Sequence, residues 1–327
     1  MNSSIENTES LRGKRILVTG AAGFIGSRLT RKLFEGGSKV SILIRPGSDL
    51  WRLEDIAGQI GIHYGDLGQL AFSQIQSKFS SLHMIYHLGA CGFDGTKIDP
   101  EEILKTNTLG TLTLLKLARH LDVERFIYCG SCSEYGAGNS FCEDSSPNPI
   151  SEYGVSKISA WMLTNIFHQN YGLPVVSLRP FMIYGPFEAP SRLIPQVITS
   201  VLKERDVELT TGEQTRDCVF IEDALDAFLR AGIMPGIIGE TFNVSTGHAT
   251  SIKDIVLTIF QLMNASVKPL FGVRPYREFE LWSSSGEPSR TRNKLHWTAQ
   301  TSLREGLQKT IHWFEENGRK YSAYVRQ

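Results

Sequence analysis

Tyr153 and Lys157 are the residues of this 327-residue chain whose types and spacing most directly suggest chemistry. Side chains four residues apart lie one turn apart on the same face of a helix, so the phenol and the ammonium can face each other. A neighbouring ammonium is expected to lower the pKa of a phenol, which is ordinarily about 10. Such a phenol could exchange a proton with a substrate hydroxyl or carbonyl near neutral pH. The same pair also occurs by chance on solvated helix faces, so its meaning depends on the rest of the chain.

A glycine-rich segment near the start of the chain has the spacing of a phosphate-binding loop. The letters G-A-A-G-F-I-G occupy positions 20–26, directly after an apolar run. In a strand–turn–helix unit the first glycine permits a tight turn and the second lets backbone N–H groups approach a pyrophosphate. The third glycine allows close packing of the helix. The sequence therefore predicts a dinucleotide site that includes Gly20, Gly23, Phe24, Ile25 and Gly26.

The kind of dinucleotide is expected to be set at the end of the second predicted strand, residues 39–44. A site that prefers NAD commonly has Asp or Glu there to hold the ribose 2′-hydroxyl, whereas this chain has Ile44 followed by Arg45. A guanidinium suits a 2′-phosphate, so we favour NADP(H) as the cofactor. NAD(H) stays open if Arg45 is merely exposed. Further cofactor contacts are expected where other strands end, at Asp66, Leu67, Leu88 and Ala90.

Apolar runs alternate with helical patterns along the first half of the chain. This alternation predicts an α/β fold with a doubly wound parallel sheet, the Rossmann arrangement, because parallel strands need crossover helices. The predicted strands cover 15–19, 39–44, 61–64, 83–88, 125–129 and 174–179, and the predicted helices cover 24–35, 103–120 and 156–171.

The pattern loosens after residue 180, which predicts a second, smaller C-terminal lobe. We expect a dinucleotide-binding domain over 11–180, to which 216–247 returns, and the second lobe over 181–215 and 248–327. The predicted elements of this half are helices over 194–203, 251–263 and 303–314 and a strand over 240–244.

Bulk composition argues against several classes of partner. Lys+Arg and Asp+Glu both number 34, so the chain has no net charge to attract nucleic acid or a membrane surface. No apolar run approaches the roughly 20 residues that span a bilayer. The polar residues 1–10 lack the apolar core of a signal peptide, so a cytoplasmic protein is expected. Cys129 and Cys132 have zinc-like spacing, but no second ligand pair follows, so no metal is expected.

These motifs together resemble the extended, sugar-nucleotide-modifying branch of the short-chain dehydrogenase/reductase superfamily. The resemblance covers the chain from about Lys14 to Phe314. Members include sugar-nucleotide 4-epimerases, 4,6-dehydratases and 4-keto-sugar reductases, so the motifs are specific for the family but not for the reaction. The segments that carry the resemblance are 19–26, 66–67, 87–90, Asn107, 131–136, 153–157, 178–180, 184–186 and 216–217.

The resemblance implies roles for residues around the Tyr/Lys pair. Ser131 matches the catalytic Ser/Thr, whose hydroxyl would hydrogen-bond the reacting oxygen. Tyr153 would be the proton donor or acceptor, and Lys157 would hold the nicotinamide ribose and tune Tyr153. Asn107 matches an asparagine that supports the active site and borders the cofactor, although a buried structural asparagine is the alternative. The resemblance also implies a homodimer that pairs the helices holding Asn107 and Tyr153.

The resemblance further implies that the second lobe binds a nucleotide sugar. Arg216 fits an R-D motif whose arginine commonly contacts the diphosphate, and Arg274 fits the arginine of a later R-P pair. For both residues an ordinary surface arginine is the alternative. Ser131, Ser133 and Arg192 complete the expected substrate site.

Two departures from the family pattern bear on the reaction. Dehydratases of the family carry Asp-Glu, or at least Glu, just after the catalytic Ser/Thr, where this chain has Cys132 and Ser133. Glu134 comes one place too late, and its side chain is expected on the other face of the strand. The chain also has Met182 where many relatives have asparagine, which suggests a less typical sugar.

We therefore favour an NADP(H)-dependent oxidoreductase that reduces a nucleotide-linked 4-keto-6-deoxy sugar at C4. A net reductase draws on a reduced cofactor pool, and the presence of Arg45 fits NADPH. The alternative is an NAD(P)-dependent nucleotide-sugar 4-epimerase, which takes a hydride and returns it. A dehydratase and a non-catalytic dinucleotide sensor are less favoured, the latter because Ser131, Tyr153 and Lys157 are all present.

Overall fold

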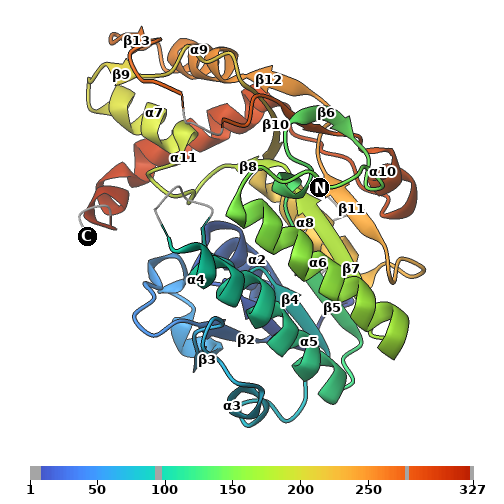
Figure 1. Cartoon of the computed structure of the whole chain (residues 1–327). Coiled ribbons are helices and arrows are strands. Elements are labelled where there is room, and N and C mark those ends of the chain that lie inside the picture. Colours follow the sequence, from blue (N-terminus) through green and yellow to red (C-terminus); the bar gives the residue numbers. More distant parts are fainter. Residues whose placement is uncertain (1–8, 93–97, 277–279, 325–327) are drawn as a thin grey trace.

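Seven parallel strands form the centre of the molecule, in the order β11-β7-β5-β4-β1-β2-β3 (Figure 1). The computed structural model describes residues 9–92, 98–276 and 280–324, and side chains up to residue 318, so most of the polar segment 1–10 lies outside it. The predicted doubly wound parallel sheet is confirmed. The bounds are β1 Arg15–Thr19, β2 Lys39–Ile44, β3 Gly61–Tyr64, β4 Met84–His87, β5 Arg125–Cys129, β7 Val175–Pro180 and β11 Thr241–Val244.

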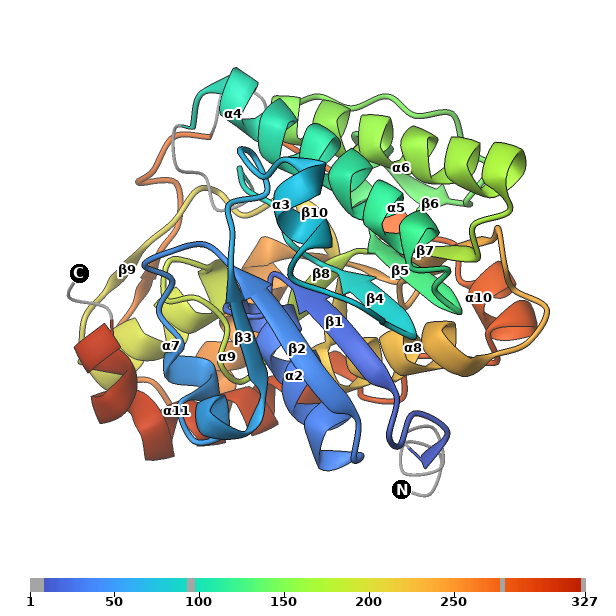
Figure 2. The ribbon, with the colours of Figure 1, turned by 90° about the horizontal axis from the view of Figure 1, so that it is seen from below.

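Helices cover both faces of this sheet, which explains why its strands are nearly continuous apolar runs. Figure 2 shows α5 and α6 on one face and α2 and α8 on the other. Leu29 of α2 and Phe228 of α8 belong to one hydrophobic cluster, and Leu114 of α5 and Phe167 of α6 belong to a second. The bounds are α2 Phe24–Glu35, α5 Gly110–His120, α6 Glu152–Tyr171 and α8 Ile221–Ile233, with the short α3 at Phe72–Gln76.

The helix predicted over 103–120 consists of three consecutive pieces. A short helix α4 (Pro100–Leu104) leads into a π-helical turn at Lys105–Leu109, which continues as α5. The wider turn accommodates one residue more than an α-helical turn, and such turns often occur at functional sites. Its residue Asn107 is buried and lies near the carboxyl edge of the sheet.

A second group of elements lies beyond the carboxyl edge of the main sheet (Figure 1). Its largest sheet has the order β12-β10-β8, and two-stranded pairs β13-β9 and β14-β6 accompany it. The chain leaves the main sheet after β7 and comes back to it with α8 and β11. The bounds are β6 Gly138–Phe141, β8 Met182–Tyr184, β9 Val207–Glu208, β10 Thr215–Phe220, β12 Ala249–Ser251, β13 Pro269–Leu270, β14 Ser284–Gly286, α7 Leu193–Leu202, α9 Ile252–Leu262, α10 Ser289–Lys294 and α11 Leu303–Tyr324.

The switch in strand order falls between β1 and β4, since β2 lies on one side of β1 and β4 on the other. In open parallel sheets, ligands bind in the crevice outside the carboxyl ends of the strands at such a point. The glycine loop follows β1, and Leu88–Ala90 follows β4, so both segments border this crevice.

Candidate active site

The glycine loop has the geometry of a pyrophosphate cradle. Gly20 has φ +71°, and a Cβ added to it would lie 2.7 Å from the backbone of Leu88 and Gly89. A Cβ at Gly26 would lie 2.1 Å from the carbonyl oxygen of Gly20. At Gly23 the Cβ would meet only that same oxygen, at 3.1 Å, so the outer side of this loop is open. No side chain caps the start of α2, and its first N–H groups therefore suit an anionic pyrophosphate.

A buried hydrogen-bond chain fixes the floor of the crevice beneath this loop. Thr19 Oγ1 lies 2.7 Å from His87 Nδ1 and accepts a bond from the Gly89 N–H. His87 Nε2 lies 2.8 Å from Thr111 Oγ1, which donates to the carbonyl oxygen of Asn107. Burial lowers the pKa of His87 to about 3, so its imidazole is neutral at physiological pH. This series of hydrogen bonds thereby joins the ends of β1 and β4 to α5, the helix that covers them.

Ser131, Tyr153 and Lys157 meet at the carboxyl end of β5. Ser131 opens a 3₁₀ turn over Cys132–Glu134, and its Oγ accepts a hydrogen bond from the Ser133 N–H at 3.1 Å. Tyr153 lies in the first turn of α6, and its hydroxyl hydrogen-bonds Ser131. Lys157 follows one turn later, with Nζ 5.8 Å from the centre of the Tyr153 ring.

The electrostatics of this cluster differ from the simple expectation. Burial raises the pKa of the Tyr153 hydroxyl, against which the hydrogen bond to Ser131 acts. Burial likewise lowers the pKa of Lys157, although the neighbouring Cys129 and Glu134 favour its charged form. The Lys157 ammonium donates to the carbonyl oxygen of Cys129 at 2.7 Å. The expected lowering of the phenol pKa is therefore wrong for the protein by itself, because burial dominates and the neighbouring Cys129, Cys132 and Glu134 raise this pKa further.

Asn107 joins the loop after β4 to the helix that carries Tyr153. Its Nδ2 donates to the carbonyl oxygen of Cys91 at 3.0 Å and to Ser156 Oγ at 2.9 Å. Its Oδ1 accepts from the Cys91 N–H at 2.9 Å. Both the oxygen and the nitrogen of the Asn107 amide are thus hydrogen-bonded to protein, as in the alternative of a buried structural asparagine. These bonds hold α6 beside the crevice.

The remaining predicted cofactor residues lie at strand ends around the crevice. Arg45 follows β2 and is exposed, and Asp66 follows β3, where its Oδ1 accepts from the Gly68 N–H at 2.9 Å. Leu67 is buried, Leu88 is half-buried and Ala90 is exposed. Each of the three predicted substrate arginines lies near a carboxylate of the second lobe. The nitrogen–oxygen distances are 2.9 Å for Arg216 and Glu280, 3.6 Å for Arg274 and Glu208, and 3.7 Å for Arg192 and Glu188.

Glu134 is placed differently from the expectation. It belongs to the 3₁₀ turn and not to a strand, and its side chain is fully buried. Its Oε1 accepts from the Ser131 N–H at 2.9 Å, and its Oε2 accepts from Arg179 Nε at 2.7 Å. The expectation that the Glu134 side chain lies on the other face of a strand is wrong, because the chain turns directly after β5. Sequence reasoning missed Arg179 as a partner, and no local spacing signals it.

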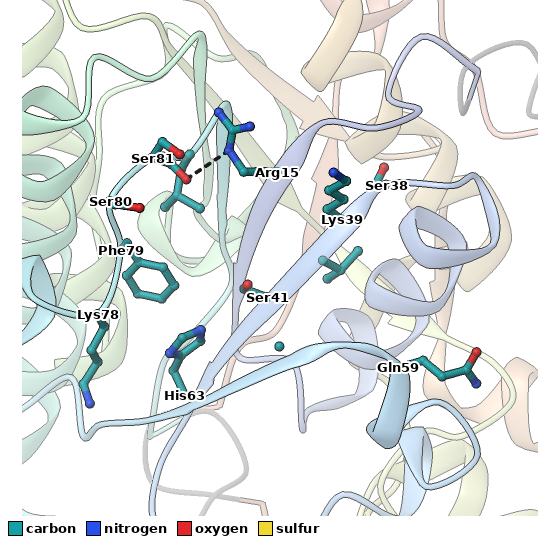
Figure 3. A pocket seen from close by; sticks show the side chains of 13 residues that line it. Arg15, Ser38, Lys39, Ser41, Gln59, His63, Lys78, Phe79, Ser80 and Ser81 are labelled. Carbon is teal, nitrogen blue, oxygen red and sulfur yellow. Dashed lines mark hydrogen bonds between the residues drawn. The ribbon is translucent and has the colours of Figure 1, made fainter.

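A hollow of about 510 Å³ opens at the opposite, amino edge of the sheet (Figure 3). Its wall contains Arg15, Lys39, Lys78 and His63, together with serines and one glutamine. None of the predicted site residues lines this hollow. The candidate site is therefore the crevice at the carboxyl edge.

Across 9–92, 98–276 and 280–324, no three or more His, Cys, Asp and Glu side chains are grouped so as to hold a metal ion. Within that same part of the chain, no helix is both long and apolar enough to cross a membrane.

Comparison with known proteins gives a consistent result. A sequence model described as the NAD dependent epimerase/dehydratase family matches residues 16–245. A UDP-glucose 4-epimerase of Mycolicibacterium smegmatis is 31% identical over 313 residues, which cover 92% of this chain and 98% of the relative. The structure of an epimerase from Methanothermobacter thermautotrophicus superposes with a TM-score of 0.90 at 29% identity, covering 98% of both chains. MoeE5, solved with UDP-glucuronic acid and NAD, has a TM-score of 0.83 at 30% identity, covering 93% of this chain and 99% of its own.

Proposed function

The chain belongs to the NAD dependent epimerase/dehydratase family of sugar-nucleotide enzymes, and we propose that it epimerises a nucleotide-activated sugar at C4. The observation that carries this proposal is the cluster of Ser131, Tyr153 and Lys157 at the carboxyl edge of the sheet. The adjoining turn has one carboxylate, that of Glu134, and it is already bound to Arg179. Dehydration needs an acid there to remove water, and the carboxylate of the turn, Glu134, is held by Arg179. This arrangement supports hydride and proton transfer at one carbon over elimination.

Each residue of the cluster has a distinct task in this proposal. A nicotinamide dinucleotide held at the glycine loop, Gly20 to Gly26, would supply the hydride acceptor and donor for C4 of the sugar. Tyr153, as its phenolate, would remove the proton of the C4 hydroxyl as that carbon is oxidised, and the resulting phenol would return the proton on reduction. Ser131 Oγ accepts from the Ser133 N–H and hydrogen-bonds Tyr153, and its hydroxyl would turn to donate to the sugar oxygen. The Lys157 ammonium stabilises the phenolate that forms beside it.

The deciding experiment uses UDP-sugars, because the relatives named above act on or bind them. UDP-glucose and UDP-glucuronic acid are incubated separately with the protein and a trace of NAD, and the products are resolved by NMR. We expect one of them to interconvert with its C4 epimer without net formation of reduced nicotinamide. A 4-keto-6-deoxy product would overturn the proposal in favour of a dehydratase, and the absence of any turnover would also count against it.

Reduction of a 4-keto-6-deoxy sugar by NADPH is a second candidate, which one observation favours. The strand β2 ends at Ile44 and is followed by Arg45, with no carboxylate at the position that usually holds the ribose 2′-hydroxyl. Stoichiometric loss of NADPH absorbance with a nucleotide-linked 4-keto sugar, and no epimerisation, would support this candidate. A preference for NADP(H) remains part of this proposal.

Replacing Arg45 with alanine tests that preference directly. A charge-assisted bond to a 2′-phosphate is typically about 1.5–3 kcal/mol, so we expect NADP affinity to fall roughly tenfold or more. The affinity for NAD, which lacks this phosphate, should change by less than about twofold. Fluorescence titration of both cofactors measures the two affinities. Lys39→Ala at the other end of β2 is the control, and an equal effect of both variants would remove Arg45 from cofactor recognition.

We propose that the second lobe, over 181–215 and 248–327, receives the nucleotide sugar, with Arg216 at its border, and that 11–180 with 216–247 receives the cofactor. Arg216 lies on β10 in the small sheet, and its guanidinium is mostly buried between Glu280 and the carbonyl oxygens of Thr215 and Leu281. It would contact the diphosphate, with Arg274 and Arg192 as additional cations. Ser133, next to the Ser131 hydroxyl, would border the sugar.

We also propose a homodimer that pairs the α5 and α6 helices of two chains. Large apolar side chains on this face are exposed, among them Leu109, Val155, Met162 and Ile166. Burial of such a cluster between subunits is favoured by the hydrophobic effect. Ile166→Glu should therefore yield monomers when light scattering is recorded during size-exclusion chromatography. Leu257→Glu, an exposed position on α9, should leave the dimer intact, and a monomeric wild-type protein would contradict the proposal.

A further inference from the structure

We infer that Glu134 is a positioning residue: its carboxylate fixes the peptide group of Ser131 and thereby directs the Ser131 hydroxyl at the reacting sugar oxygen. This inference rests on the proposed catalytic role of Ser131. It assigns a task to the one acidic residue of the turn, which lies too far along the chain to act as a family dehydratase acid.

The turn is closed by two reciprocal hydrogen bonds. Glu134 Oε1 accepts from the Ser131 N–H at 2.9 Å, while Ser131 Oγ accepts from the Ser133 N–H at 3.1 Å. Ser131 is held in extended backbone geometry, with φ −162° and ψ 149°. The Ser131 hydroxyl thus accepts from backbone and also hydrogen-bonds Tyr153, so a ligand oxygen would share or take over the Tyr153 bond. Without the carboxylate, the backbone of Ser131 would lose the bond that sets its orientation.

Arg179 holds the carboxylate from its other side. Its Nε donates to Glu134 Oε2 at 2.7 Å, and both side chains are at most 1% exposed. The guanidinium also donates to the Tyr135 hydroxyl at 2.9 Å and lies 4.6 Å from the centre of the Trp161 ring. A buried ion pair usually contributes little net stability compared with well-packed apolar residues. Its placement directly behind a catalytic serine is better explained by orientation of that serine.

Gly130 supplies the space that the carboxylate needs. A Cβ added at this position would lie 2.4 Å from Glu134 Oε1, so any larger residue would push the carboxylate away from the Ser131 N–H. Gly130 has no positive φ that would otherwise require glycine. Glycine is therefore needed at position 130 to make room for the Glu134 carboxylate, and not to allow an unusual backbone conformation.

The same network reaches the elements that border the substrate lobe. The Tyr135 hydroxyl donates to Asn243 Oδ1 at 2.8 Å, and Thr291 Oγ1 donates to the carbonyl oxygen of Asn243 at 2.7 Å. Asn243 belongs to β11 and Thr291 to α10. Ser131 is thus placed relative to both lobes through Glu134 and Arg179, which keeps its hydroxyl in register with a ligand held between them.

Glu134→Gln tests the inference with little change of shape. One oxygen acceptor becomes an amide donor that faces the Arg179 Nε–H, so the side chain must turn away from one of its partners. We expect kcat to fall about 10- to 100-fold, because a displacement of about 1 Å in a catalytic group can cost that much. KM should change much less, since Glu134 is not expected to contact the sugar nucleotide.

A double-mutant cycle separates positioning from general damage. If Glu134 acts through Ser131, then Glu134→Gln should lower kcat no further in a Ser131→Ala background. The same fold loss in both backgrounds would overturn the inference, as would an unimpaired Glu134→Gln enzyme. Full activity of Ser131→Ala alone would instead refute the catalytic role of Ser131 in the proposed function.

Glu143→Gln is the matched control. Glu143 is also a buried carboxylate, and its Oε1 accepts from the Asn243 N–H at 2.8 Å, but none of its described hydrogen bonds or ion pairs reaches Ser131. Its replacement should lower thermal stability while kcat stays within about twofold of wild type, as for a residue outside the reacting set. An equal loss of kcat in both glutamine variants would reduce Glu134 to a structural residue.

A crystal structure of Glu134→Gln gives a readout that needs no turnover. The expected result is a rotated Ser131 hydroxyl that has lost its bond from the Ser133 N–H. A Ser131 hydroxyl left in place would overturn the inference, whatever substrate the enzyme proves to use.

Discussion

Replacement of Tyr153 by phenylalanine is expected to lower kcat by about 10²- to 10⁴-fold, the range typical of a lost general acid or base. The phenylalanine keeps the ring beside the Lys157 ammonium but removes the hydroxyl that hydrogen-bonds Ser131. The Lys157 ammonium is directed to the carbonyl oxygen of Cys129 and is therefore not placed to take over the proton. Steady-state assays with the active UDP-sugar measure the loss.

The binding of ligands provides the control for this variant. Tyr153→Phe should bind the cofactor and the sugar nucleotide within about threefold of wild type, since the hydroxyl acts mainly in the transition state. Tyr171→Phe, near the other end of the same helix and exposed, should behave as wild type in every assay. Retention of more than a tenth of the wild-type kcat by Tyr153→Phe would rule out this phenol as the proton carrier.

Replacement of Arg179 by methionine is expected to have the largest effect on stability. It leaves the Glu134 carboxylate buried without its cation, and breaking a buried pair in this way typically costs about 3–5 kcal/mol. For a chain of this size, the loss corresponds to a fall in Tm of roughly 6–15 °C. Calorimetry at neutral pH measures this change.

The double replacement Glu134→Leu with Arg179→Met distinguishes the charge from the packing. Two apolar side chains of similar volume leave no unpaired charge, so most of the lost stability should return. Activity should stay low, because the Ser131 N–H still lacks its acceptor. If the double variant were no more stable than Arg179→Met, then lost packing against Trp161 and Tyr135, and not the stranded carboxylate, would explain the single variant.

The strands and helices of the main sheet could be predicted from the sequence because each is a local apolar pattern. The strand at Arg15–Thr19 and the helix at Phe24–Glu35 have the predicted bounds. The strands β6, β8, β12 and β14, which have three or four residues each, were not predicted. The pair β14-β6 joins Ser284 to Gly138, and no local pattern reveals a contact at such separation along the chain.

The candidate site divides in the same way. The glycine spacing and the four-residue interval from Tyr153 to Lys157 are local, so the sequence places them well. Other parts of the site depend on strands that only the fold brings together. These are the hydrogen bonds that link Thr19, His87 and Thr111 and the bond between Glu134 and Arg179. The shift in the Tyr153 pKa was predicted with the wrong sign, because spacing reveals a neighbouring charge but not the extent of burial.

The return of the chain to the main sheet has a consequence for how this protein can be divided. A fragment ending at Pro180 would lack α8, whose buried Phe228 and Leu225 cover one face of the sheet, and β11, which pairs along β7. Such a truncation would leave an apolar face and an open strand edge in water, which promotes aggregation. A gene cut after β7 would therefore not yield a dinucleotide-binding domain that folds by itself. During synthesis, this domain can complete its core only after residue 244 has left the ribosome.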